Sequence, residues 1–245
     1  MKNGIRKVLA LVCVSVMLFT VCMAAAETTQ ETNQSPGWLH EAVKKFGETP
    51  THVWITFITL LMTGAVLLIV AKTRKQWTTK AIAYGALSIA LSFVLSCIRL
   101  FRMPNGGSVT PASMLPVMLF SATFGIGPGL LTGMAFGVLQ CLQGGGIVAA
   151  GGFAQFALDY LLAFTVLGLA GLAKNFKKSW GLYAAMAIAV VSRLVCHTLA
   201  GVLFWNTELW ASFVYNISYI GPDLAICLVL ALAIAKPVMK IMRAQ

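Results

Sequence analysis

Long apolar stretches alternate with short polar or basic segments along this chain, a pattern typical of a protein that crosses a membrane several times. Residues 52–72 form an apolar stretch of about the 20 residues that a spanning helix needs, and it ends at basic residues. A polar segment at 76–80 then leads into a denser apolar block. We expect an additional transmembrane helix at 52–72 and a separate transmembrane domain at 79–245.

The apolar block divides into six helical segments. Glycine, proline and polar residues mark the breaks, and we expect helices at about residues 81–100, 110–124, 130–142, 152–172, 181–204 and 211–235. The second and third segments are short for separate spans, so we expect them to form a compact helical pair. A turn-rich loop at 102–108 should face outward. The predicted fold is an all-α polytopic membrane protein with a six-helix core.

The N-terminal part of the chain has the features of an export signal. Residues 1–26 combine a basic start, an apolar run and a small-residue end, which is typical of a signal peptide or an N-terminal membrane anchor. Residues 27–51 are polar and too poor in apolar side chains to fold alone. We expect them to form an extracytoplasmic linker.

The composition agrees with this organisation. With 59% hydrophobic and 10% charged residues and a mean hydropathy of +0.85, the chain has more apolar surface than a soluble core can hide. The net charge of +11 does not indicate nucleic-acid binding, because the basic residues lie in short clusters at the ends of apolar segments. Most of these clusters fall at alternate segment ends, which predicts a cytoplasmic C-terminus.

Neither the cysteines nor the histidines predict a metal site. The six cysteines lie within apolar stretches and lack the close pairs of zinc or redox motifs, and the three histidines fall in different segments. We therefore expect no metal and no cofactor, and we interpret the thiols as small buried hydrophobes.

Four glycines recur at every fourth position from the end of the second helix into the third: Gly125, Gly129, Gly133 and Gly137. Such a ladder of small residues lets two helix backbones approach closely in a membrane, where van der Waals packing drives helix association. We interpret the ladder as a helix-packing surface rather than as part of a ligand site.

The strongest functional signal is a polar stripe inside the fifth helical segment. Arg193, His197, Gly201 and Trp205 recur every four residues, so a helix carries them along one face. Ionisable side chains at membrane depth are costly and usually face a protein interior or a water-filled cavity. The stripe therefore predicts a polar-ligand site between helices.

Polar residues of two other helices come to the same depth. With a rise of about 1.5 Å per residue, Asp159, His197 and Asn216 all lie about 8–12 Å below the outer ends of their helices. Tyr160 adds a phenol beside Asp159. Trp205 lies at the outer mouth, where an indole near a carboxylate can enclose an organic cation.

Four segments of the sequence together resemble the ThiT (YuaJ) family, the thiamine-specific S components of energy-coupling factor (ECF) transporters. These segments are residues 104–110, 157–164, 197–205 and 215–219, and the resemblance extends over about residues 79–235. It implies a six-helix substrate-capturing subunit with an outward-facing thiamine pocket, located in the plasma membrane of a bacterium.

The family pattern assigns six residues to the pocket: Asp159, Tyr160, Arg193, His197, Trp205 and Asn216. By this resemblance, the acidic position of Asp159 holds the aminopyrimidine ring. Trp205 stacks on the ligand, and Arg193 takes a position where the family commonly has a basic residue. The remaining three residues contribute a phenol and further polar contacts.

The resemblance also implies partners. Ala86 and Ala90 match the small-residue motif through which S components dock on the shared transmembrane coupling subunit. The sequence has no Walker A motif, so we expect ATP hydrolysis to come from two partner ATPase subunits. The chain is thus expected to bind thiamine or a thiamine-like molecule and deliver it, and not to be an enzyme.

Other ligands stay open, because residues 147–152 and Ala211 differ from the family pattern. The alternatives are another small vitamin or a thiamine precursor. A membrane enzyme is a further alternative, with Asp159, His197 and Arg193 as acid, base and anion clamp.

A purely structural interpretation of the same residues is also open. In it, Asp159 and Arg193 form an ion pair that locks two helices, and Trp205 is an interfacial aromatic anchor. The buried charges would then specify helix pairing in an assembly protein.

Overall fold

The computed structural model describes residues 77–104, 106–144, 155–176, 180–205 and 207–244. All of them belong to the unit Thr59–Gln245. The predicted signal or anchor segment, the polar linker and the additional helix at 52–72 lie outside the described residues, and so does the segment 147–152.

Six helical segments make up the described part of the chain, as the sequence predicts. They are α4 (Thr79–Cys97), α5 (Leu115–Phe124), α6 (Ile126–Gly144), a composite helix of η2 (Ala157–Leu162), α8 (Ala163–Thr165) and η3 (Val166–Asn175), α9 (Gly181–Phe204) and α10 (Leu209–Arg243). Among the described residues five helices are long and apolar enough to cross a membrane, and α5 is shorter. The bounds of α9 are as predicted, whereas α10 continues past residue 235 to Arg243.

The third helix begins earlier than the sequence predicts and is long enough to cross a membrane alone. α5 ends at Phe124, and its C-cap Gly125 has a φ of 107°, which is costly for residues with a side chain. α6 starts at the next residue, because Pro128 lies in its first turn, where the missing N–H breaks no helical hydrogen bond. The expectation of two short segments is therefore right for α5 and wrong for α6.

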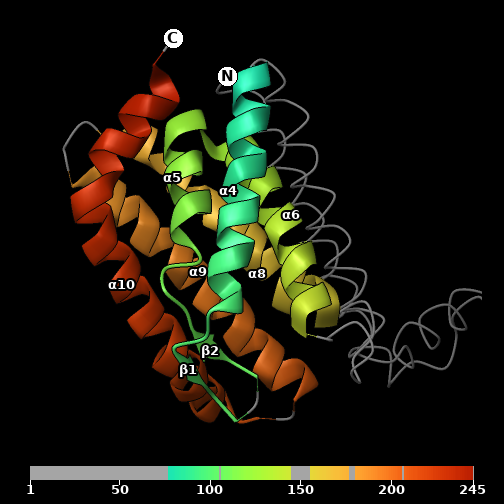
Figure 1. The fold of residues 1–245 in the computed structure, drawn as a ribbon. Helices are drawn as coiled ribbons and strands as arrows, with labels where there is room; N and C mark the ends of the chain where they lie inside the picture. The colour runs from blue at the N-terminus through green and yellow to red at the C-terminus, as the bar shows by residue number, and fades with distance from the viewer. Residues whose placement is uncertain (1–76, 105, 145–154, 177–179, 206, 245) are drawn as a thin grey trace, which may run out of the picture. The chain divides into compact units, whose positions relative to one another are not determined.

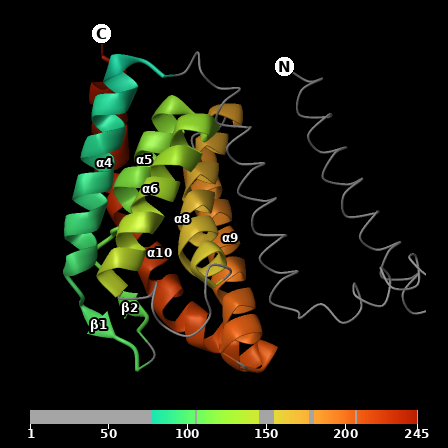
Figure 2. The ribbon, with the colours of Figure 1, turned by 90° about the vertical axis from the view of Figure 1, so that its right-hand side faces the viewer.

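The helices pack side by side around α5 (Figure 1 and Figure 2). Every residue from Leu115 to Thr123 is buried, and α5 contacts α4, α6, η3 and α10. Phe120 of α5 and Phe136 of α6 are among the largest fully buried side chains. Because longer helices enclose α5, the sequence of α5 is apolar on all sides.

A small antiparallel hairpin, β1 (Phe101–Arg102) and β2 (Ser108–Val109), occupies the region where the sequence predicts a turn-rich loop. Gly106 has a φ of 98°, a conformation that favours glycine in a turn. The hairpin lies at the end of the bundle opposite the C-terminus, where α9 ends and α10 begins (Figure 1). Strands of two residues are too short for alternation of polar and apolar residues to reveal them.

The glycine ladder packs α6 tightly against its neighbours. A Cβ atom on Gly137 would lie 2.6 Å from the Tyr160 carbonyl oxygen, and one on Gly133 would overlap the Phe164 carbonyl oxygen. A Cβ atom on Gly129 would lie 2.5 Å from a serine hydroxyl of α5. These close approaches confirm the packing interpretation for three of the four glycines.

Candidate functional site

The helix that carries Asp159 and Tyr160 departs from α geometry at these residues. η2 is a π-helix, and after α8 the chain continues as the 3₁₀-helix η3. A π turn redirects the side chains within it, and such turns are frequent at functional sites. Gly137 of α6 packs against the Tyr160 carbonyl group, so the close helix contact holds this turn in place.

His197 lies between the carboxylate of Asp159 and the guanidinium of Arg193. Its Nδ1 is 2.6 Å from Asp159 Oδ1, and Arg193 Nε donates to its Nε2 across 3.2 Å. Because Nε2 accepts a hydrogen bond, the ring proton is on Nδ1 and is donated to the carboxylate, and the imidazole is neutral. Within the described residues there is no direct Asp159–Arg193 ion pair, because His197 bridges the two groups.

An aromatic side chain supports this bridge. The guanidinium carbon of Arg193, a residue only 8% exposed, lies 4.2 Å from the centroid of the Phe164 ring. The same ring meets His197 edge-on at a centroid distance of 6.3 Å. The cation–π contact compensates part of the hydration that buried Arg193 has lost, so Phe164 stabilises both members of the bridge.

A second branch of the network comes from α10. Tyr219 meets the His197 ring at a centroid distance of 6.4 Å, and its hydroxyl donates to Asn216 Oδ1 across 2.7 Å. Asn216 Nδ2 in turn donates to the Ser212 carbonyl oxygen across 2.9 Å. The composite helix, α9 and α10 therefore meet in one continuous network, with Tyr219 as the link between His197 and Asn216.

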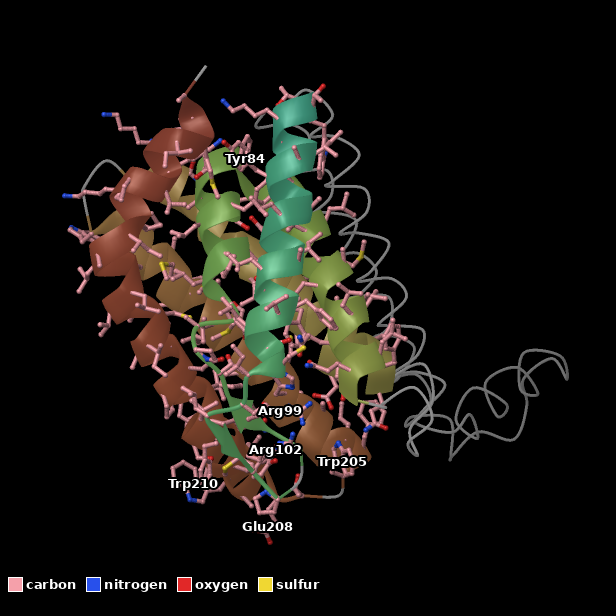
Figure 3. The ribbon with its side chains drawn as sticks, in the orientation of Figure 1. Tyr84, Arg99, Arg102, Trp205, Glu208 and Trp210 are labelled. Atoms are coloured by element: carbon pink, nitrogen blue, oxygen red, sulfur yellow. The ribbon has the colours of Figure 1, made fainter. Side chains whose placement is uncertain are left out.

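Tyr160 and Trp205 lie differently with respect to this network. Tyr160 follows Asp159 in the π turn and is half-buried. Trp205 is the C-cap of α9, is 52% exposed and lies at the hairpin end of the molecule (Figure 3). The position of Trp205 agrees with the mouth of a site, but its ring is not part of the described network.

The hairpin segment is fastened to α10 beside the network. The Gly107 N–H donates to the Tyr215 hydroxyl oxygen across 3.1 Å, and a Cβ atom on Gly107 would lie 2.7 Å from the Tyr219 ring. Further along, the backbone N–H and the hydroxyl of Thr110 donate to Asp223 Oδ1 across 3.3 and 2.8 Å. The segment therefore packs on the part of α10 that carries Tyr219.

A hollow of about 550 Å³ lies at the other end of the molecule, lined by the last turns of α10: Lys236, Met239, Lys240, Arg243 and Ala244. No residue of the network is part of this lining. We place the candidate site at the network, because it joins ionisable side chains of different helices deep in the bundle.

Comparison with known proteins identifies the family. A family model described as "Thiamine transporter protein (Thia_YuaJ)" matches residues 82–243, a range that contains the whole network. The chain belongs to the thiamine transporter family. Together with the apolar helices, this makes it a multi-pass membrane transport protein and not an enzyme. The acid–base interpretation of Asp159, His197 and Arg193 is therefore wrong.

Two similar proteins support the assignment of this chain to the thiamine transporter family. The thiamine transporter ThiT of Bacillus subtilis (strain 168) is 31% identical over 143 residues, which are 51% of this chain and 73% of that protein. A solved structure of ThiT from Listeria monocytogenes matches with a TM-score of 0.50 and 22% identity, covering 66% of this chain and 93% of the other. This second likeness supports the predicted all-helical membrane fold.

Sequence reasoning missed three residues that lie in or beside the network in the structure: Phe164, Tyr219 and Asp223. Tyr219 and Asp223 follow Asn216 by three and seven residues in the sequence, so helical periodicity on α10 could have found both. For Phe164 the sequence holds no such signal, because a phenylalanine in an apolar helix is ordinarily a core residue.

The predicted docking residues lie on an exposed face of α4. Ala86 and Ala90 are exposed, and so are Ile82 and Leu87, at 58% and 61%. The buried positions of this helix are small or carry hydroxyl groups. An apolar outer face with small residues suits a helix that contacts lipid or a partner helix in the membrane.

Proposed function

We propose that this member of the thiamine transporter family is the substrate-capturing S component of an ECF importer, and that it binds thiamine or a thiamine-like cation beside Asp159. The proposal rests on one observation above all, the ionisable network of Asp159, His197 and Arg193 inside helices that can span a membrane. Such groups are costly at membrane depth and mark functional sites. Family membership supports thiamine as the ligand.

Asp159 is the central acceptor of the proposed site. Its Oδ1 accepts from His197, while Oδ2 has no hydrogen-bond partner among the residues that the structure describes. The free oxygen is suited to accept from the amino group of the pyrimidine ring. Arg193 acts by holding His197 in the tautomer that donates to Asp159, which keeps the carboxylate oriented.

The other predicted residues complete the pocket. Tyr160 offers a phenol hydroxyl beside the carboxylate, and Asn216 contributes polar contacts from α10. Trp205, at the hairpin end, stacks on the ligand as it enters (Figure 3). An aromatic ring and a carboxylate together favour an organic cation over a neutral or anionic molecule.

Delivery of the ligand requires partners. We propose that Ala86 and Ala90 dock α4 on the transmembrane coupling subunit, and that two ATPase subunits drive release. The chain would lie in a bacterial plasma membrane with its hairpin outside and its C-terminus in the cytoplasm. The basic residues of the last turns of α10, Lys240 and Arg243, support this orientation.

Tryptophan fluorescence of the purified protein tests the proposal. Thiamine should quench the emission in a saturable way, and D159N should weaken binding by about tenfold or more, because a charge-assisted acceptor is lost. E208Q is the matched control, because Glu208 is an exposed acid at the hairpin end of the molecule and outside the described network (Figure 3). Folded wild-type protein that ignores thiamine would contradict the proposal.

Mass spectrometry of co-purified small molecules separates the ligand alternatives. Ala211 and residues 147–152 depart from the family pattern, which is the reason to test thiamine precursors and other small vitamins in parallel. If one of these compounds co-purifies with the protein or binds more tightly than thiamine, the proposed ligand is wrong and the proposed transport function stands.

A further inference from the structure

The hollow at the C-terminal end of the bundle is separate from the proposed thiamine site and has a chemistry of its own. Three of the five described residues that line it are basic: Lys236, Lys240 and Arg243. They follow one another at spacings of four and three residues, so the last turns of α10 present them on one face. The hollow has a volume of about 550 Å³, which is within the range of sites that bind small molecules. One helix face therefore gathers three positive charges around a space of ligand size.

The rest of the lining is apolar. Met239 lies between the basic residues along the helix, is half-buried and packs against the hydrophobic core of the bundle. Ala244 adds a small side chain. A hollow with basic residues around an apolar floor suits a molecule that joins an anionic group to a hydrocarbon chain, because each part then has a partner.

No acidic side chain of the described helices balances these charges. Past residue 50 the sequence has three acids, Asp159, Glu208 and Asp223. Asp159 is engaged by His197 in the network, and Glu208 lies at the hairpin end (Figure 3). Asp223 precedes Lys236 by 13 residues, about 20 Å along α10, and salt largely screens an attraction over that distance. The described helices therefore leave the three charges without a counter-charge.

The length of α10 places the hollow at the level of lipid headgroups. Trp210, near the start of the helix at the hairpin end, is 72% exposed, and exposed tryptophans are typical of the membrane interface (Figure 3). At about 1.5 Å per residue, Lys236 lies about 39 Å further along the helix, whereas the hydrocarbon core of a bilayer is about 30 Å thick. A tilt of about 20°, which is usual for a spanning helix, shortens this distance only slightly. The basic residues therefore lie past the hydrocarbon core.

We propose that this hollow binds the headgroup of an anionic phospholipid from the leaflet at the C-terminal end of the bundle. Lys240 and Arg243 contact the phosphate, because a guanidinium can donate two parallel hydrogen bonds to phosphate oxygens and an ammonium adds a compact charge. Met239 contacts the start of an acyl chain. The site is independent of the thiamine pocket, since the hollow and the network share no residue.

Native mass spectrometry of the full chain in detergent tests the proposal. Phosphatidylglycerol and phosphatidylcholine with the same acyl chains are offered in equal amounts, so the two lipids differ in net charge but share the phosphate and the chains. Wild-type protein should retain phosphatidylglycerol in preference. K240Q and R243Q should each lower the ratio of bound phosphatidylglycerol to bound phosphatidylcholine by about fivefold, because each basic residue near a membrane surface contributes about that much to the attraction of anionic lipids.

K80Q is the matched control for the loss of one positive charge. Lys80 lies in the first turn of α4, which begins at the same end of the bundle, but it does not line the hollow (Figure 1). The lipid ratio of K80Q should stay within about twofold of the wild-type ratio. A thiamine titration of each variant checks that the protein is folded, since none of these residues belongs to the network.

Three results would contradict the lipid site. An equal drop of the ratio in K80Q would mean that the basic residues act only as a general surface charge that sets the topology. A wild-type ratio in both K240Q and R243Q would mean that the hollow does not bind the lipid. Displacement of phosphatidylglycerol by millimolar inorganic phosphate would make a free anion the ligand. None of these results bears on the proposed thiamine transport, because the lipid ratio does not depend on thiamine.

Discussion

Asn216 illustrates how a buried polar side chain is held by its neighbours. Its carbonyl oxygen accepts from Tyr219 and its amide nitrogen donates to the Ser212 carbonyl, so both ends of the amide are engaged. Ser212 in turn donates through its hydroxyl to the Thr198 carbonyl oxygen across 2.8 Å, which ties α10 to α9. Asn216 therefore orients Tyr219, and Tyr219 contacts His197.

The substitution Tyr219→Phe tests this chain of contacts. It removes the hydroxyl and leaves the buried carbonyl oxygen of Asn216 without its donor, which should cost about 1–3 kcal/mol of stability. Thermal unfolding in detergent measures the loss. Tyr215→Phe is the matched control, because Tyr215 is less buried than Tyr219 and loss of its hydroxyl should cost less. Equal losses in both variants would mean that the Asn216 contact carries no special weight.

The spacing of residues in the sequence predicts Asp159 and His197 as neighbours, and the structure joins them by a hydrogen bond. Helical rise gives the depth of a residue, but it does not give the direction of its side chain. For this reason the sequence could not decide whether Asp159 meets Arg193 directly or through His197. The exposed position of Trp205 also depends on where α9 ends relative to its neighbours, which no local pattern reveals.

Among the helices, the composite one has the most irregular backbone. π geometry, one short α segment and a 3₁₀ segment follow one another between Ala157 and Asn175. Gly133 and Gly137 allow α6 to contact the carbonyl groups of Phe164 and Tyr160 in this helix. The glycine ladder therefore supports the site, although none of its residues is predicted to touch a ligand.

Gly137→Ala should disturb both stability and binding. The new Cβ atom would lie 2.6 Å from the Tyr160 carbonyl oxygen, so the helices must separate, at a cost of about 1–3 kcal/mol. Thiamine affinity should fall as well, because Tyr160 and Asp159 share the displaced turn. Val138→Ala, a change at the neighbouring and exposed position, should do neither. Unfolding temperatures measure the stability of both variants, and fluorescence titrations measure their thiamine affinity. Unchanged affinity in Gly137→Ala would argue against a role of the glycine ladder in supporting the site.

The sequence predicts the number of helices and the bounds of α9, because long apolar segments between basic or turn-forming residues are distinctive in a membrane protein. It misplaces the start of α6, because Gly and Pro residues suggest a break that Pro128 at a helix start does not cause. The π turn has no sequence signature of its own. It depends on the neighbouring helix, and so it could not be predicted.

At the scale of the whole molecule, α4 reverses the usual arrangement of polar and apolar side chains. Its buried face carries Ser88, Ser92 and Ser96, and its outer face carries alanines and large aliphatic residues. Near its end, Ser96 accepts from Gln140 Nε2 of α6 across 2.7 Å. Polar contacts therefore fasten the end of α4 to α6, and the exposed outer face of α4 suits contact with lipid or a partner helix.

Replacing Ala86 and Ala90 together by Leu tests the proposed docking face. Both side chains are exposed, so thiamine affinity should stay within about twofold of the wild type. Co-purification with the coupling subunit should be lost, because the larger side chains keep the helix backbones apart. Ala233→Leu, at an exposed position of α10, is the control and should retain the complex. A stable complex of the Leu variant would rule out this face.

The π turn at Ala157–Leu162 has a consequence for how this helix can vary in length. A π turn holds one residue more than an α turn, so removing a single residue there would rewind it to ordinary α pitch and keep the segments on either side in phase. Only the side chains within the turn, Asp159 among them, would point in a new direction. Asp159 would then leave His197 even though no side chain had been exchanged. Such a one-codon deletion would therefore misdirect the acid while leaving the helix on either side of the turn aligned.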